Sequence, residues 1–458
     1  MKIGLLPLYV KLYDDKLPEM RIRLEKFYND IVQKFEKQEI SVVKSPFCRL
    51  KNEFFEAVKL FETERVDTIV TVHMAYSPSL ESIDALSETN LPIIVLDTTE
   101  TLEFTNTQDS EEIMYNHGVH GVMDMCSMLT RRGKEFSIVA GHFETSNCIK
   151  ETCGLVRAIV SANALKGSKV GLFGGLFDGM GDFQVSDSEL NKTFGIEVVH
   201  ISSEKMKKYV NQVSETEIET ECKTNESLYD FDDNLIDVEY AQSIRAGLAI
   251  RKCVEEEKLS SFSINFTNIG EKSGIPTMPF IECCKSMEKG IGYAGEGDVM
   301  TAAFVGALLQ GYKETNFVEI FCPDWKNNMM FLSHMGEINY RIAATKPCVA
   351  RVGVNYSPGS FPYVGYARMM GGKGVYLNIC RGRDNFKLLI SLAEMIEYDS
   401  DCFDGSIRGW MKTEIDSAEF LKKLSQNGST HHSIFVYGAS IDEMQLFGKL
   451  LNIETIII

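Results

Sequence analysis

Two glutamates and two histidines in the C-terminal half of the chain have the side chains best suited to chemistry. Each lies at the edge of a different apolar segment, and the four are Glu296, Glu319, His334 and His432. A buried carboxylate or imidazole costs free energy unless another group pairs with it. Two oxygen and two nitrogen donors suit a divalent metal ion and leave positions free for a substrate. The residue types therefore predict a metal site.

Each of these residues, taken alone, also has an ordinary structural interpretation. Glu296 stands between two glycines and could be a surface loop residue, and Glu319 could point to solvent from an edge strand. His334 could be a hydrogen-bonded core histidine, and the pair His431-His432 could belong to a polar loop. Only the joint occurrence of the four favours the metal site.

Length, charge and cysteine pattern narrow the class of protein. A chain of 458 residues is too long for a single core, so two to four domains are expected. The formal net charge of −18 argues against nucleic acid or an anionic membrane as the main partner. The 12 cysteines include no C-x-x-C, which favours reduced, buried thiols over a zinc or redox site.

The N-terminal apolar run, residues 3–10, is a poor signal sequence. Pro7 interrupts it, and the charged residues Lys11 and Asp14 follow closely. No apolar segment reaches the length needed to span a bilayer. The expected location is the cytoplasm.

The first half of the chain alternates short β-branched runs with amphipathic helical stretches. The strand-like runs are 2–8, 40–43, 68–72 and 92–96, then 170–173, 198–201 and 262–266. The helical stretches are 19–36, 54–64 and 79–86, then 238–257. This βαβ alternation predicts parallel sheets with helices on both faces.

Two stretches inside the second series could be mistaken for motifs. The glycine-rich stretch 171–182 lacks the G-K-[ST] of a phosphate loop, so a turn-rich loop after a strand is predicted. The acidic stretch 215–239 is typical of a solvated helix face and its connection.

Beyond about residue 314 the strand candidates become short and closely spaced. They are 317–321, 329–332, 338–342, 349–354 and 374–379, followed by helices at 417–424 and 441–451 and a strand at 453–458. Such spacing predicts an antiparallel sheet or barrel. The predicted fold is α/β: two doubly wound parallel-sheet domains, 1–165 and 166–313, followed by an antiparallel, barrel-like domain, 314–458.

One long motif, G-Y-A-G-E-G-D-V-M-T-A-A, stands at 292–303. Shorter motifs stand at 116–121, 141–142, 317–319, 332–335 and 431–432. Together, and in this order, they resemble the motifs of the L-arabinose isomerases, with the L-fucose isomerases as more distant relatives.

The resemblance implies roles for the matching positions. Glu296, Glu319, His334 and His432 match the family's divalent-metal ligands, and the two glutamates also match its acid/base pair. Positions implied to contact the sugar are Tyr76, His117, His120, Phe266, Met335 and His431. Because His120 matches a histidine that reaches a neighbouring subunit's site, the resemblance also implies a homo-trimer or homo-hexamer with sites at subunit interfaces.

The implied reaction is aldose–ketose isomerisation through an enediol(ate), nearest to the interconversion of L-arabinose and L-ribulose. A divalent cation on the carbonyl and the neighbouring hydroxyl would polarise the carbonyl. One carboxylate would take the C2 proton while a second acid serves the oxygens. Mn²⁺ is the expected cation, with Mg²⁺, Co²⁺ or Fe²⁺ as alternatives.

Departures from the family pattern leave the sugar open. His117 stands where the arabinose enzymes usually have glutamine, and residues 320–324 after Glu319 differ from theirs. Another pentose, a hexose or a deoxysugar is therefore an alternative substrate. Two other functions also stay open: a non-catalytic sugar-binding or regulatory relative, and a metal-dependent epimerase or lyase acting on sugar acids.

Overall fold

A computed structural model describes residues 1–458 and divides them into two compact units, Met1–Val160 and Ser161–Ile458. Helix α7 (Cys148–Leu165) carries the chain from the first unit into the second. None of the helices combines the length and the apolar character that crossing a bilayer requires. Each unit has its own sheets and is described by itself.

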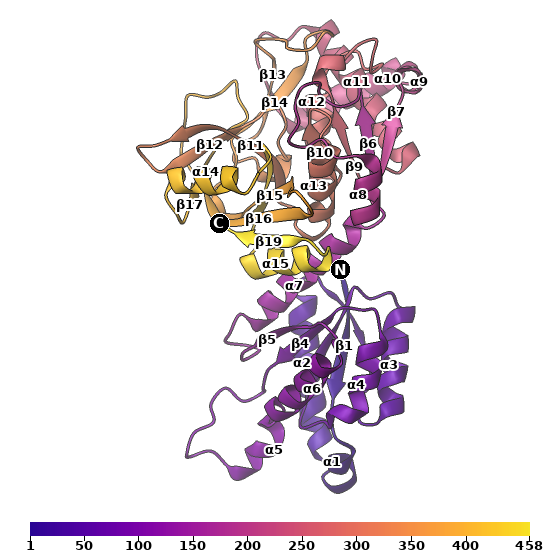
Figure 1. Ribbon diagram of the computed structural model, residues 1–458, viewed down its shortest axis with the longest axis vertical. Coiled ribbons are helices and arrows are strands. Elements are labelled where there is room, and N and C mark those ends of the chain that lie inside the picture. Colours follow the sequence, from indigo (N-terminus) through magenta and orange to yellow (C-terminus); the bar gives the residue numbers. More distant parts are fainter. The chain divides into compact units, whose positions relative to one another are not determined.

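The first unit, drawn in indigo and purple in Figure 1, contains a five-stranded parallel sheet in the order β2-β1-β3-β4-β5. Its strands are β1 (Lys2–Leu8), β2 (Ser41–Lys44), β3 (Thr68–His73), β4 (Ile93–Asp97) and β5 (Ser137–Ala140). Its helices are α1 (Lys11–Lys16), α2 (Met20–Glu36), α3 (Lys51–Thr63), α4 (Ser79–Glu88), α5 (Ile113–Asn116) and α6 (Val119–Arg131), with a 3-10 turn at Ser110–Glu112. Helices cover both faces of this sheet, because strands buried on both sides need apolar cover on each.

Sequence periodicity explains which helix face is buried. In α2, Leu24, Phe27, Ile31 and Phe35 recur every three or four residues and are almost fully buried. On the other face of the sheet, Leu6 and Leu8 of β1 join one core with apolar residues of α3, α4 and α6. The alternation predicted from sequence is confirmed here.

The second unit begins with a four-stranded parallel sheet in the order β10-β9-β6-β7. Its strands are β6 (Lys169–Phe173), β7 (Glu197–Ile201), β9 (Ser261–Ile264) and β10 (Gly292–Gly295). The helices around it are α8 (Asp187–Phe194), α9 (Ser203–Asn211), α10 (Glu215–Leu228), α11 (Asp237–Glu257), α12 (Phe280–Glu288) and α13 (Val299–Gly311), with a 3-10 turn at Phe266–Asn268. Residues 174–182 form turns and bends, as predicted for the glycine-rich stretch.

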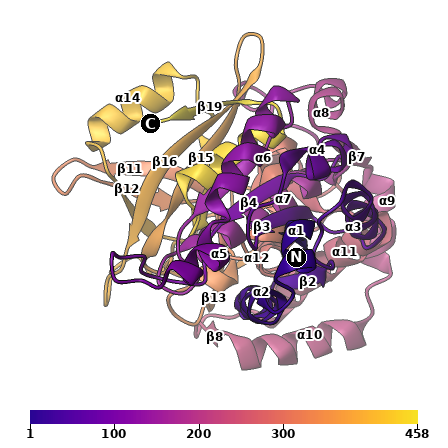
Figure 2. The same cartoon turned by 90° about the horizontal axis from the view of Figure 1, so that it is seen from below.

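The rest of the second unit is built on a closed antiparallel barrel. Six strands follow one another around it, and the pairing of β15 with β16 closes the ring. They are β11 (Thr315–Asp324), β12 (Met329–Ser333), β17 (Gly409–Thr413), β16 (Phe386–Ile396), β15 (Gly372–Arg381) and β18 (His432–Tyr437). Figure 2 shows the long strands β15 and β16 lying side by side. The predicted barrel-like region is thereby confirmed.

Smaller elements complete the barrel region. Strand β19 (Glu454–Ile457) adds to β16 in parallel, and helices α14 (Ser417–Gln426) and α15 (Ile441–Leu450) pack nearby (Figure 1). A separate three-stranded sheet joins β8 (Asp230–Phe231), β13 (Cys348–Arg351) and β14 (Tyr363–Tyr366).

One predicted strand is wrong. Residues 338–342 form no strand, and Tyr340–Ile342 is a 3-10 turn. The side chain of Asn339 accepts a hydrogen bond from the backbone N–H of Arg341 and donates to the carbonyls of Lys313 and Thr315. A side chain that bonds the local backbone in this way competes with a strand ladder. The predicted boundaries at 165 and 313 stay a prediction.

Candidate metal and sugar site

Strand register in the barrel brings three of the four predicted ligands together. On β11, Glu319 stands opposite His432 of β18 and opposite Ser333 of β12. Directly opposite residues of antiparallel strands project from the same face, so Glu319 and His432 are neighbours. Strand β12 ends at Ser333, and His334 follows where the chain turns.

The fourth residue, Glu296, comes from the parallel sheet. It follows β10 directly and has a φ of 65°, a left-handed conformation that side-chain-bearing residues rarely adopt. Its backbone is held there, because its N–H donates to the carbonyl of Ile264 and its carbonyl accepts from the N–H of Phe177. The glutamate is only 9% exposed. Backbone strain of this kind concentrates at functional sites.

The predicted ligands form two overlapping groups that share His432. Glu319, His334 and His432 offer ligand atoms that lie within 4.8 Å of one another, and so do Glu296, His431 and His432. The distance from Nε2 of His334 to Glu319 is 3.8 Å, and from Nε2 of His432 to Glu296 it is 3.5 Å. His431, predicted from the resemblance to contact the sugar, also lies 3.4 Å from Glu296.

Buried carboxylates bond the Nδ1 atoms of His334 and His432, whose rings are the two inner imidazoles of the cluster. Nδ1 of His334 lies 2.6 Å from Glu337, and Nδ1 of His432 lies 3.0 Å from Asp298. Because a carboxylate accepts, each Nδ1 carries a proton, which leaves Nε2 as the ring nitrogen that can ligate a cation. Nε2 of His432 is buried and has no hydrogen-bond partner. Metal-ligating histidines have this arrangement, so these residues fit a bound cation.

The floor of the site is closely fitted around His334. A Cβ atom at position 295 would lie 2.7 Å from Cε1 of His334, so only glycine leaves enough room for the imidazole ring. Glu337 is 1% exposed, yet both its oxygens are satisfied, by the hydroxyl of Tyr293 at 3.0 Å and by the N–H of Gly336 at 2.9 Å.

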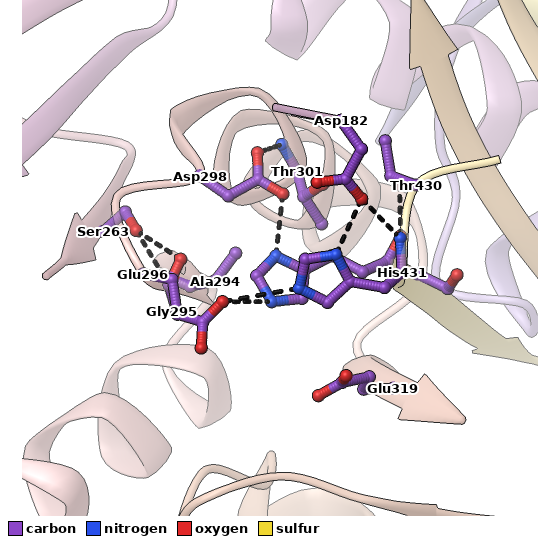
Figure 3. A network of polar contacts seen from close by, with 12 residues as sticks. Asp182, Ser263, Ala294, Gly295, Glu296, Asp298, Thr301, Glu319, Thr430 and His431 are labelled. Carbon is purple, nitrogen blue, oxygen red and sulfur yellow. Dashed lines mark hydrogen bonds and ion pairs between the residues drawn. The ribbon is translucent and has the colours of Figure 1, made fainter. Parts of the chain in front are cut away.

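A loop of the glycine-rich stretch covers His431, the outer histidine of the cluster. Asp182 accepts hydrogen bonds from Nδ1 of His431 at 2.7 Å and from its backbone N–H at 2.9 Å. The ring of Phe183 stacks on His432 with centroids 5.2 Å apart and planes 7° apart. Figure 3 shows Asp182 and Asp298 on one side of the imidazole rings and Glu319 on the other.

The two glutamates differ in their electrostatic surroundings. Burial opposes ionisation of Glu296, but the neighbouring imidazoles of His431 and His432 outweigh it and hold the pKa of that carboxyl well below its usual range. Burial raises the pKa of Glu319, and the nearby histidines only partly offset this. Paired carboxyls whose pKa values are pushed apart can take different acid/base roles.

His431 carries a positive charge over a wide pH range. Burial lowers its pKa, but the hydrogen bonds to Asp182 and Glu296 outweigh burial and raise the pKa to about 10. An imidazolium donates from both ring nitrogens. His431 is therefore suited to hold Glu296 in place.

Sequence reasoning missed three residues of this cluster: Asp182, Asp298 and Glu337. Asp298 and Glu337 stood within three residues of predicted ligands, in apolar surroundings where an acidic side chain needs a partner, and that signal could have found them. Asp182 gave no such signal, since it lies 249 residues from the histidine it bonds.

A cavity of about 630 Å³ adjoins the cluster. His334 lines it together with Phe266 and Met335, two residues predicted to contact the sugar. Volumes of this order accommodate small-molecule ligands.

The remaining predicted residues cluster in the first unit. Tyr76 stacks on His120 with ring centroids 4.8 Å apart, and His117 meets His120 edge-on at 5.1 Å. Nε2 of His117 shares a hydrogen bond with the hydroxyl of Tyr13 at 2.8 Å. Beneath them His73, missed from sequence, is 4% exposed with both ring nitrogens unpartnered.

Comparisons with known proteins agree with the motifs. The model of the L-arabinose isomerase central domain matches residues 178–310, and that of the L-arabinose isomerase C-terminal domain matches residues 314–454. An L-arabinose isomerase of Shouchella clausii is 25% identical over 405 residues, covering 85% of this chain and 81% of the relative. That of Oceanobacillus iheyensis is 24% identical over 414 residues, covering 86% and 85%.

Among solved structures, a periplasmic solute-binding protein from Actinobacillus succinogenes with bound D-allose covers 68% of this chain and 91% of its own, at 16% identity. Its TM-score of 0.18 is too low to bear on fold or function. The two domain models together span most of the second unit, and the full-length relatives extend the match to the first. The chain belongs to the L-arabinose isomerase family.

Proposed function

We propose that Glu296, Glu319, His334 and His432 hold a divalent cation, Mn²⁺ in the first instance, and that the protein uses it to interconvert an aldose and its ketose. The observation that carries this proposal is the pair of Nε2 atoms, each on a ring held by a buried carboxylate and each facing a glutamate. Through its relatives, the nearest substrate pair is L-arabinose and L-ribulose.

A bound divalent cation supplies a Lewis acid that polarises adjacent oxygens of the sugar. The chain itself supplies the proton transfer between C2 and C1. Glu319 is the better acid/base, because burial raises its pKa toward the range in which a carboxyl exchanges protons readily. Glu296, kept ionised by His431 and His432, is the better anchor.

Two alternatives are less well supported. A non-catalytic sugar binder has no need for glutamates facing the free nitrogens of two buried imidazoles. An epimerase or lyase of sugar acids would gain from a lysine or arginine that pairs with the substrate carboxylate, and neither lines the cavity beside His334.

The direct test replaces the proposed acid/base. Glu319→Gln keeps the side-chain shape but removes the proton acceptor, so turnover of L-arabinose with saturating Mn²⁺ should fall by about 10²–10⁴-fold. Glu314→Gln, an exposed glutamate just before β11, is the matched control and should turn over normally. Wild-type turnover in Glu319→Gln would refute the assignment.

We also propose that copies of the chain associate as trimers or hexamers, with His120 of one copy serving a neighbour's site. His120 is exposed on the first unit, with Tyr76 stacked against its ring. If sites are shared, mixing inactive His120→Ala subunits with inactive Glu319→Gln subunits should restore part of the activity, because some interfaces regain both side chains. No recovery after verified subunit exchange would show that each chain is self-sufficient.

A further inference from the structure

The cavity beside His334 has an apolar floor. Phe280 is 2% exposed and Val352 is 8% exposed, and Pro362 is buried with them. Seven of the eighteen lining residues are aromatic, and none is acidic, lysine or arginine. The buried floor therefore presents carbon to whatever lies against it.

Polar groups near this floor are already engaged. The hydroxyl of Ser333 donates to the carbonyl of Ile407 at 2.6 Å. The amide of Asn355 donates to the carbonyl of Gly359 at 2.9 Å and accepts from the N–H of Ser357 at 3.0 Å. These two side chains are thus not free to replace the water around a ligand hydroxyl.

Hydroxyls that make no such hydrogen bond are found on more exposed lining residues. They belong to Tyr356, which is 69% exposed, and to the half-buried Ser357, Tyr366 and Ser406. Such groups can serve hydroxyls in the middle of a sugar. The buried floor offers none, so a hydroxyl there would lose its water without a replacement.

We propose that the physiological substrate is an aldose with an apolar far end, a terminally deoxygenated sugar whose methyl group contacts Phe280 and Val352. This rests on the proposed function, which places the carbonyl carbon and its neighbour at the cluster next to His334. The far carbons then enter the adjoining cavity. A methyl group gains by leaving water there, whereas a hydroxymethyl group loses its hydrogen bonds.

The test compares sugars that differ only in the C6 hydroxyl. The pairs are D-fucose with D-galactose, L-fucose with L-galactose, and L-rhamnose with L-mannose, and the first pair has the C2–C4 configuration of L-arabinose. For each pair that the protein converts, kcat/KM should be about 10–100-fold higher for the deoxy sugar than for its partner. Equal values, or a preference for the C6 hydroxyl, would overturn the inference, and would be expected if a second copy of the chain covered the floor.

A matched pair of variants ties the preference to the floor. Val352→Thr adds one hydroxyl to the floor at constant shape, so the deoxy preference should shrink toward one. Val349→Thr makes the same change at a buried residue of β13 that does not line the cavity, and the preference should persist. Thermal unfolding confirms that both variants are folded. An unchanged preference in folded Val352→Thr would contradict the inference.

The outcomes separate this inference from the proposed function. Conversion of L-arabinose or any other aldose without the deoxy preference leaves the isomerase proposal standing and overturns only the substrate class. If no aldose, L-arabinose included, is converted with any of the divalent cations named above, both fail together.

Discussion

The rings of His334 and His432 are each fixed by a carboxylate that also makes a second hydrogen bond. Asp298 bonds His432 and also caps α13 by accepting from the N–H of Thr301 at 2.9 Å. Glu337 bonds His334 and is held in turn by Tyr293. Neither ring can rotate without breaking a buried hydrogen bond. The direction of each Nε2 is therefore set before any cation arrives.

Changing the carboxylate behind His432 should weaken cation binding. Asp298→Asn retains an oxygen for the cap of α13 but loses the charged acceptor for the ring. The affinity for Mn²⁺, measured by titration calorimetry on metal-free protein, should fall about 10–100-fold. Asp178→Asn, an exposed aspartate of the neighbouring loop, should bind like wild type. Equal affinities in the two variants would show that Asp298 is only a helix cap.

For single residues, the sequence identified those that belong to local motifs and missed those whose partners lie far away along the chain. Glu296 and Glu319 stood out because acidic side chains interrupted apolar runs. The partnership of Asp182 with His431 depends on a loop folding back over a strand from a distant part of the chain. No local pattern encodes such a contact.

Helices α10, α11 and α12 are joined by a half-buried ionic network. Arg251 bonds Glu221 at 2.8 Å and Glu282 at 2.6 Å, and Lys285 bonds Glu221 at 2.5 Å. Burial opposes ionisation of Glu221, but Arg251 and Lys285 outweigh it and lower its pKa to about 2. Removing one partner of such a network leaves the others buried and unpaired.

This network should make stability depend on pH. The pKa of Glu221 falls from 4.5 to about 2 on folding. Its contribution to the free energy of unfolding is therefore full at pH values above the unfolded-state pKa, and it is lost as the pH falls through the folded-state pKa. Glu221→Gln should cost about 3 kcal/mol at neutral pH, and the difference should vanish on acidification. Urea unfolding across this range measures it, with the exposed Glu226→Gln as control. A pH-independent difference would contradict the assignment.

Helices and strands of the parallel sheets were predictable because their periodicity is local. The prediction for 338–342 failed although Ile338, Tyr340 and Ile342 do alternate and are all buried. Asn339 turns the backbone there by bonding it with its own side chain. The spacing of the strands predicted a barrel-like region, but the particular pairing of β15 with β16 and β18 depends on packing between distant segments.

The division into two compact units predicts where a cation stabilises the molecule. Both tryptophans, Trp325 and Trp410, lie in the second unit, so their fluorescence reports that unit alone. Free Mn²⁺ at about 100 times its Kd should stabilise the folded unit by about 2.7 kcal/mol and raise the midpoint of thermal unfolding. EDTA should reverse the shift, and Glu296→Gln should largely abolish it. An unshifted wild-type midpoint would argue against the site.

Closure of the barrel has a consequence for how the cluster can fail. Glu319, Ser333 and His432 share one register across three adjoining strands of a ring without free edges. An edge strand of an open sheet can shift its register alone. In the closed barrel, a shift of register in one strand requires the other strands to shift as well. Loss of the cluster is therefore all-or-none, and the amide protons of β11, β12 and β18 should exchange with solvent in a single concerted opening.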